Sequence, residues 1–265
     1  MLKEIILKTE DSEEIYADWR VKGHENSFLL CHGFLQYKDS RIFRLMAEKL
    51  SGYFDVLSID MRGHGKSSGV FTYGSREKYD VKAALDFLRG KYRKTYVMGF
   101  SLGASASLQA VLENKTADFL ILVSPPSRFG KIFPRFWTRA AFRALIGSFG
   151  SGKKVRGFNI FSAGKCGTDI FSELTIPALI IYSDEDWVIS KKHIRDIRKY
   201  TKPNVDFVEF AGSAHAEHIF EQNQEVFLKK LLNWIGRSGK NNFQEVDYEQ
   251  MSHKQIPVDM VETPY

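Results

Sequence analysis

Short runs rich in apolar residues alternate with longer stretches of helical periodicity along this chain. The runs predict six strands of a mostly buried sheet: Ser27–Cys31, Asp55–Ile59, Thr95–Phe100, Phe119–Val123, Ala178–Tyr182 and Asp206–Phe210. The segments between and after them predict five helices: Arg41–Leu50, Tyr79–Leu88, Leu102–Leu112, Ser190–Tyr200 and Glu217–Ile235. Two earlier runs, Leu2–Lys8 and Glu14–Val21, predict an antiparallel pair joined by an acidic turn. This alternation predicts an α/β fold, in which helices cover both faces of an open, mostly parallel sheet.

The composition supports a folded chain with a sizeable core. The chain has 265 residues, of which 43% are apolar, and only two cysteines, so whole-chain disorder and a disulfide scaffold are excluded. No apolar run approaches the roughly 20 residues that span a bilayer, and the first residues lack the pattern of a signal peptide. The two widely spaced cysteines favour a reducing compartment, and we predict a cytoplasmic location.

The positive charge is concentrated in one segment. The formal net charge is +6, but residues 125–170 hold nine basic residues and one acidic residue, a balance of +8, which leaves −2 for the remainder. A nucleic-acid-binding protein usually shows a broader basic face, so we expect no nucleic-acid partner.

The strongest chemical signal follows the strand Thr95–Phe100. The sequence Gly99-Phe100-Ser101-Leu102-Gly103 is a G-x-S-x-G motif between a predicted strand and a predicted helix, the setting of a nucleophile elbow. Small residues on both sides let the backbones pass, and the sharp turn lifts the Ser101 hydroxyl into the open. The alternative interpretation is an ordinary glycine-rich turn between a strand and a helix. We favour the nucleophile elbow and predict that Ser101 is the nucleophile.

A serine hydroxyl needs a base, and the base needs an acid that orients it. His215 follows the last predicted strand, and we favour it as the base over His218, which we expect to lie inside the next helix. Asp184, Glu185 and Asp186 follow the strand Ala178–Tyr182, and we favour Asp186 because Trp187-Val188-Ile189 would close off the loop behind it. The rival position, Ser124-Pro125-Pro126-Ser127, offers no carboxylate.

Two backbone amides are predicted to form an oxyanion hole. The elbow supplies the N–H of Leu102, and the loop His32-Gly33-Phe34 supplies the N–H of Phe34. His32 is expected to organise this loop. The motif Asp60-x-Arg62-Gly63-His64-Gly65-x-Ser67 is expected to brace it through local hydrogen bonds, since Asp60 and His64 have no further metal ligands at useful spacing.

In this order the motifs resemble those of the serine α/β-hydrolase family, over about residues 14–236. The match is most similar to single-domain esterases and monoacylglycerol-lipase-like enzymes. The resemblance implies an α/β-hydrolase fold, the Ser–acid–His order of Ser101, Asp186 and His215, and an acyl-enzyme intermediate. It implies no metal and no organic cofactor. Ala214 departs from the family, which often has glycine before the histidine.

The predicted organisation is a core domain formed by residues 1–124 and 173–236, a lid insert at 125–172 and a C-terminal tail at 237–265. Arg135, Arg139 and Arg143 form one stripe of a basic amphipathic helix in the insert. A lid over an acyl pocket, a surface for anionic lipid and a clamp for an anionic substrate all fit this helix, as does a lid with merely solvated arginines.

The sequence therefore predicts a serine hydrolase that cleaves carboxylic esters of medium or long acyl chains. A thioesterase or acyltransferase that uses the same triad on an anionic carrier is the enzymatic alternative. A non-catalytic binding module on a hydrolase scaffold is the other, because a fold does not guarantee an activity. The expected partner is a small-molecule acyl ester, with peripheral contact to anionic lipid as one role of the basic insert. The oligomeric state stays open.

Overall fold

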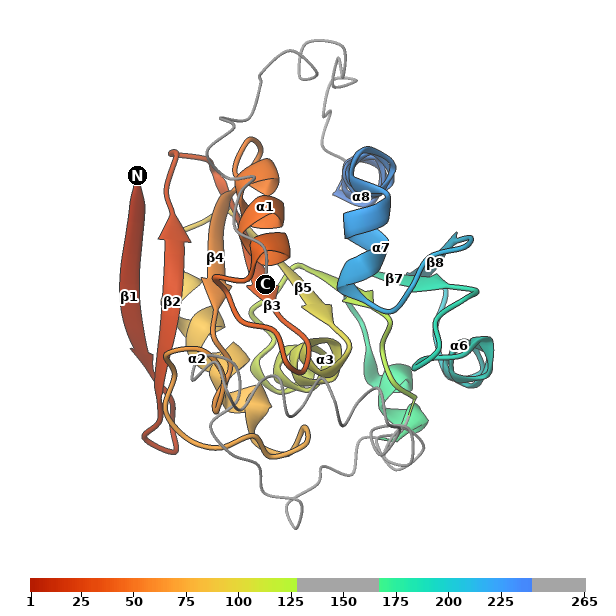
Figure 1. Cartoon of the computed structure of the whole chain (residues 1–265), viewed down its shortest axis with the longest axis horizontal. Coiled ribbons are helices and arrows are strands. Elements are labelled where there is room, and N and C mark those ends of the chain that lie inside the picture. The colour runs from red at the N-terminus through yellow and green to blue at the C-terminus, as the bar shows by residue number, and fades with distance from the viewer. Residues whose placement is uncertain (128–166, 240–265) are drawn as a thin grey trace, which may run out of the picture. The chain divides into compact units, whose positions relative to one another are not determined.

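Eight strands form one sheet in the computed structural model, which describes residues 1–127 and 167–239 (Figure 1). Their spatial order is β1-β2-β4-β3-β5-β6-β7-β8. The strands are β1 (Leu2–Lys8), β2 (Glu14–Arg20), β3 (Asn26–Cys31), β4 (Asp55–Ile59), β5 (Lys94–Phe100), β6 (Phe119–Val123), β7 (Ala178–Ser183) and β8 (Val205–Phe210). Strand β2 is antiparallel to both β1 and β4, and β3 to β8 are mutually parallel. The predicted α/β fold is confirmed.

Helices follow most strands. They are α1 (Arg41–Leu50), α2 (Glu77–Leu88), α3 (Leu102–Asn114), the short 3-10 helix η3 (Thr168–Glu173), α6 (Lys191–Arg198), α7 (Glu217–Gln222) and α8 (Gln224–Gly239). No helix in the described ranges is long and apolar enough to cross a membrane.

The two faces of the sheet carry separate sets of apolar side chains, because successive residues of a strand point to opposite faces. On one face, Leu29 of β3 and Val97 of β5 belong to the same buried cluster as apolar residues of α2, α3 and α6. On the other face, Phe28 of β3 stacks on Tyr96 of β5, and Phe43 of α1 meets Phe100 of β5 edge to face. Helices therefore cover both faces, as the alternation of strands and helices predicts.

The chain changes direction across the sheet between β3 and β5. These two strands are neighbours, but the chain leaves β3 for β4 on one side and later returns to β5 on the other. Loops at such a point diverge, which leaves a crevice beyond the carboxyl ends of the two strands. The loop after β3 begins at His32 and the turn after β5 holds Ser101, so both predicted reactive segments lie at this point of the sheet, where ligands of open α/β sheets usually bind.

The predicted helix Glu217–Ile235 is wrong in one respect, because two helices replace it. Asn223 separates α7 from α8 with φ −137° and ψ 37°. Its side-chain amide donates to Ser213 Oγ at 2.8 Å and to the Ile219 carbonyl at 3.1 Å, and such bonds compete with the helical backbone ladder. Helix α8 also continues to Gly239, past Ile235, where the predicted helix ends, and into the first residues of the predicted tail.

The chain divides into two compact units, Met1–Gln224 and Glu225–Tyr265. Residues 128–166 and 240–265 lie outside the described part. The basic stripe of Arg135, Arg139 and Arg143 and most of the predicted tail therefore stay predictions, and so do the proposed domain boundaries.

Candidate active site

Ser101 sits in a strained turn between β5 and α3. Its φ of 49° and ψ of −107° are outside the regions that L-residues favour, at a cost of about 1–3 kcal/mol that the surrounding structure must outweigh. The glycines at both ends make the turn sterically feasible. A Cβ at Gly99 would lie 2.3 Å from the Gly103 carbonyl oxygen, and one at Gly103 would lie 2.4 Å from the His32 carbonyl oxygen. The predicted strand–turn–helix setting of Ser101 is therefore present.

The structure brings Ser101, His215 and Asp186 into one hydrogen-bonded chain. His215 Nε2 lies 2.9 Å from Ser101 Oγ, and His215 Nδ1 lies 2.8 Å and 2.9 Å from the two Asp186 carboxylate oxygens. Since the ionised carboxylate only accepts, Nδ1 carries the proton and Nε2 presents its lone pair to the serine hydroxyl. These three residues come from turns after β5, β8 and β7, so strands far apart in the sequence supply one array.

Asp186 is held in its ionised form. Burial of this side chain opposes ionisation, but the hydrogen bonds from the His215 ring and from the Ile189 N–H outweigh it and lower the pKa of Asp186 below its ordinary value. One carboxylate oxygen also accepts the N–H groups of Val188 and Ile189 at 2.9 Å and 2.7 Å. A fixed negative charge under His215 favours the protonated imidazole that proton transfer from a serine would create.

The rival residues face other partners. Asp184 accepts the Gly212 N–H at 2.8 Å on the exposed side of its loop. His218 Nδ1 lies 2.9 Å from Glu221 Oε2, one turn along α7, and half of its side chain is exposed. The structure therefore joins neither of them to Ser101.

Ser124 is a component of this array that the sequence reasoning missed. This fully buried residue follows β6, and its φ is 50°. Its hydroxyl accepts the Ala216 N–H at 3.1 Å and also bonds to the Asp186 carboxylate, which helps to lower the pKa of that group. Strand β6 lies between the strands that precede Ser101 and Asp186, so a polar residue at its carboxyl end was the available signal.

The loop after β3 packs directly on the nucleophile elbow. A Cβ added at Gly33 would lie 3.3 Å from the Phe100 carbonyl oxygen and 3.6 Å from Ser101 Cβ. His32 holds this loop through both ring nitrogens, with Nδ1 2.7 Å from the Gly33 carbonyl and Nε2 2.9 Å from the Met61 N–H. Burial, reinforced by the charge of neighbouring His64, lowers the pKa of His32 to about 3, which keeps the ring neutral.

His32 thereby sets the direction of one predicted oxyanion donor. The Gly33 carbonyl and the Phe34 N–H belong to the same planar trans peptide and point in opposite directions. Fixing the carbonyl toward His32 turns the Phe34 N–H the other way. Leu102, the other predicted donor, is the first residue of α3, where helix N–H groups have no acceptor within the helix.

The loop after β4 braces its neighbours through hydrogen bonds and ion pairs. Asp60 accepts the N–H groups of Lys38 and Lys66 at 2.7 Å and 3.0 Å, and burial raises its pKa to about 6. The Arg62 guanidinium joins Asp11 and Asp80, each at 2.7 Å. No cluster of three potential metal ligands occurs within residues 1–127 and 167–239.

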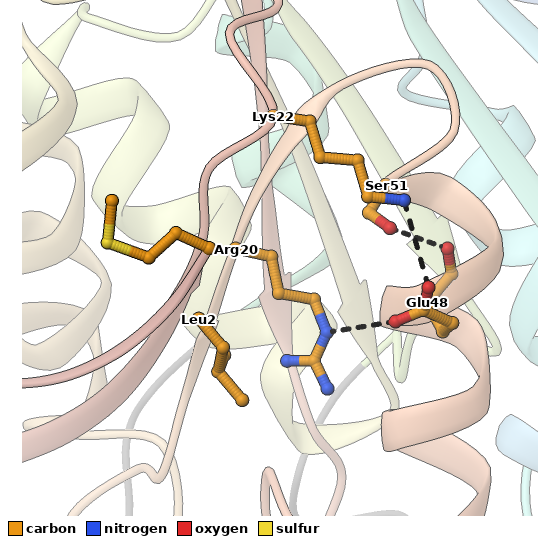
Figure 2. A pocket seen from close by; sticks show the side chains of 6 residues that line it. Leu2, Arg20, Lys22, Glu48 and Ser51 are labelled. Carbon is orange, nitrogen blue, oxygen red and sulfur yellow. Dashed lines mark hydrogen bonds and ion pairs between the residues drawn. The ribbon is translucent and has the colours of Figure 1, made fainter.

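A pocket of about 170 Å³ lies elsewhere, at the start of β1 and the ends of β2 and α1 (Figure 2). Glu48 faces both basic side chains there, at 3.7 Å from Arg20 and 3.7 Å from Lys22. Arg20 pairs with Val56 near the amino end of β4, so this pocket lies at the opposite end of the sheet from Ser101.

Comparison with known proteins agrees with this architecture. A model of the alpha/beta hydrolase family matches residues 28–173, more than half of the chain. The chain belongs to this family. As a member of this family, the chain is a hydrolase. The matched segment includes the loop after β3 and the turn at Ser101 between β5 and α3.

Several alpha/beta hydrolases of known structure share the fold. The esterase Pf2001 of Pyrococcus furiosus is 21% identical, with a TM-score of 0.74 over 90% of this chain and 93% of that one. The esterase RhEst1 of a Rhodococcus species is 17% identical, with a TM-score of 0.70 over 89% of this chain and 99% of that one. An uncharacterised protein of Rickettsia prowazekii, RP471, is 23% identical over 69% of this chain, and the match spans 65% of that protein's length.

Proposed function

We propose that this alpha/beta hydrolase cleaves carboxylic esters with Ser101 as nucleophile, His215 as general base and Asp186 as the acid that orients the base. The hydrogen-bonded chain of Ser101 Oγ, the His215 ring and the Asp186 carboxylate carries the proposal, because each contact lies between 2.8 Å and 2.9 Å. The fold shared with esterases supports an ester substrate.

The reaction follows from the directions of these groups. His215 Nε2 takes the Ser101 proton while Oγ attacks the ester carbonyl carbon, and the N–H groups of Leu102 and Phe34 bind the developing oxyanion. Nε2 then returns the proton to the departing alcohol as the C–O bond breaks, which leaves an acyl-enzyme. In the second half, Nε2 deprotonates a water molecule that attacks the acyl carbon, and the proton returns to Ser101 Oγ as the acid leaves. No step requires a metal or an organic cofactor.

A series of p-nitrophenyl esters from acetate to palmitate tests the proposal, with Ser101→Ala as the control. We expect turnover that disappears in Ser101→Ala, and an optimum at medium or long acyl chains. The chain-length preference comes from the aromatic residues in the sequence of the insert at 125–172, which include Phe129, Phe133, Phe136 and Trp137. The cytoplasmic location also stays a proposal from cysteine usage.

Labelling with a fluorophosphonate gives an independent readout, because it reports a reactive serine whatever acyl chain the enzyme prefers. If no ester is hydrolysed and Ser101 is not labelled, the catalytic proposal is wrong and a binding module on this scaffold replaces it.

A further inference from the structure

A buried carboxylate lies beside the predicted nucleophile without taking part in the triad. Glu217 is the first residue of α7, two positions after His215, and is only 8% exposed. Its Oε2 is 3.7 Å from the point that a Cβ on Gly33 would occupy, and Ser101 Cβ is 3.6 Å from the same point. The two atoms therefore lie within 7.3 Å of each other, the sum of these distances.

Glu217 differs from the other buried acids in having no partner. Asp60 and Asp186 accept backbone N–H groups, Asp80 pairs with Arg62, and Glu77 accepts three donors from Thr72 and Gly74. Asp18 and Asp55 are also paired. Within residues 1–127 and 167–239, by contrast, the Glu217 carboxylate makes no hydrogen bond and no ion pair.

The position of this side chain depends on a strained backbone conformation in the residue before it. Ala216, between His215 and Glu217, has φ 50° and ψ −108°, nearly the conformation of Ser101. Such a conformation costs about 1–3 kcal/mol in a residue other than glycine and persists only where surrounding contacts enforce it. The Ser124 hydroxyl enforces it here by accepting the Ala216 N–H. The same turn therefore sets both the base and the buried carboxylate.

Although the residue is only 8% exposed, neither carboxylate oxygen is among the fully buried polar atoms that lack a partner, so both oxygens still reach solvent. A carboxylate accepts hydrogen bonds, and a donor that arrives with the substrate could therefore bind here, a cationic donor most strongly because its charge is opposite. We propose that Glu217 is a specificity residue that binds a protonated amine of the substrate, carried within a few bonds of the scissile carbonyl. The preferred substrates are then ammonium-bearing esters, such as aminoacyl esters. This inference rests on the proposed ester hydrolysis at Ser101.

Matched pairs of phenyl esters isolate this contact, because each pair exchanges an ammonium group for a methyl group of similar size. The pairs are glycyl with propanoyl, β-alanyl with butanoyl, and 4-aminobutanoyl with pentanoyl. The measurement is kcat/KM at neutral pH from released phenol, with each value divided by the spontaneous hydrolysis rate of the same ester. Wild type, Glu217→Gln and Glu221→Gln are compared. Glu221→Gln is the matched control, since it removes the same charge from α7 at an exposed position that pairs with His218.

We expect wild type to prefer the ammonium member of at least one pair, and Glu217→Gln to lose about tenfold or more of that preference. Glu221→Gln should retain the preference. Glu221→Gln should also hydrolyse the phenyl esters with methyl-terminated acyl chains at the wild-type rate, and the ratio within each pair isolates the ammonium contact in Glu217→Gln from any general change in activity.

If the ratio of kcat/KM for the ammonium member to kcat/KM for the methyl member is the same in wild type and Glu217→Gln, the inference is wrong, and the proposed ester hydrolysis is unaffected. If Glu217→Gln fails to fold, the wild-type ratios decide alone, and a value of one or less in every pair overturns the inference. If no ester of either kind is cleaved and fluorophosphonate does not label Ser101, the proposed function itself is wrong, and the inference falls with it.

Discussion

Replacing Ser124 with alanine should damage the proposed triad of Ser101, His215 and Asp186 without changing any of these three residues. The change removes the acceptor of the Ala216 N–H and one hydrogen bond to Asp186. A buried N–H left without an acceptor costs about 1–3 kcal/mol, so the free energy of unfolding should fall by that amount. Loss of about 1.4 kcal/mol of support for the Asp186–His215 pair would lower kcat/KM about tenfold.

A pH profile separates this positioning role from simple destabilisation. The Ser124 hydroxyl lowers the pKa of Asp186, so its removal should raise the proton affinity of the Asp186–His215 pair. The acid limb of kcat/KM should therefore move to higher pH in Ser124→Ala. The matched control is Ser127→Ala, which removes another fully buried hydroxyl, one that lies 2.7 Å from His193 Nδ1. It should lose stability but keep the wild-type profile.

Glycine at position 124 gives a second way to distinguish a loss of stability from a loss of activity. With φ at 50°, Ser124 occupies a backbone region where glycine avoids the steric cost, so Ser124→Gly should be about 1 kcal/mol more stable than Ser124→Ala. Both variants lack the hydroxyl and should lose the same activity. Urea unfolding and ester hydrolysis measure the two quantities. Wild-type kcat/KM and an unshifted acid limb in both variants would refute the reasoning.

Three further predictions concern the triad, the elbow and the buried imidazoles. Asp186→Asn should lower kcat on p-nitrophenyl esters by about 10⁴-fold with little change in fold, and near-normal turnover would contradict the role of Asp186. Gly103→Ala should lower the free energy of unfolding, measured with urea, by about 1–3 kcal/mol or more, because the added Cβ would lie 2.4 Å from the His32 carbonyl oxygen. Gly52→Ala, whose Cβ would have an ordinary 3.4 Å contact, should be tolerated, and equal effects would exclude the steric argument. Burial lowers the pKa of His32 to about 3 and of His64 to about 4, against 6.5 in an unfolded chain. The unfolded chain therefore binds protons first as the pH falls below 6.5, and the free energy of unfolding should decline from there toward pH 4. In His64→Phe the free energy of unfolding should decline less steeply, by up to about 1.4 kcal/mol per pH unit. If the change in this free energy between pH 7 and pH 5 is the same in wild type and His64→Phe, His64 does not contribute to the decline.

Local patterns in the sequence determine most of the fold. Buried parallel strands must be apolar on both faces, so Phe28, Val97 and their neighbours mark β3 and β5 without reference to the rest of the chain. The elbow is equally local, because the steric need for Gly99 and Gly103 arises within one turn. The roles of Ser101, Asp186 and His215 are predicted from the order of serine, acid and histidine along the chain, which resembles that of serine α/β-hydrolases. The tertiary structure brings these three side chains together.

Contacts between distant segments decide the rest. The helix break at Asn223 depends on a hydrogen bond to Ser213, which periodicity along α7 and α8 does not reveal. Ser124 and Glu217 are ordinary polar residues in the sequence. They become significant only because β6 lies between β5 and β7 and because a strained Ala216 directs the start of α7 toward Gly33. A sequence shows which residues can do chemistry, whereas burial and the absence of a partner are properties of the folded neighbourhood alone.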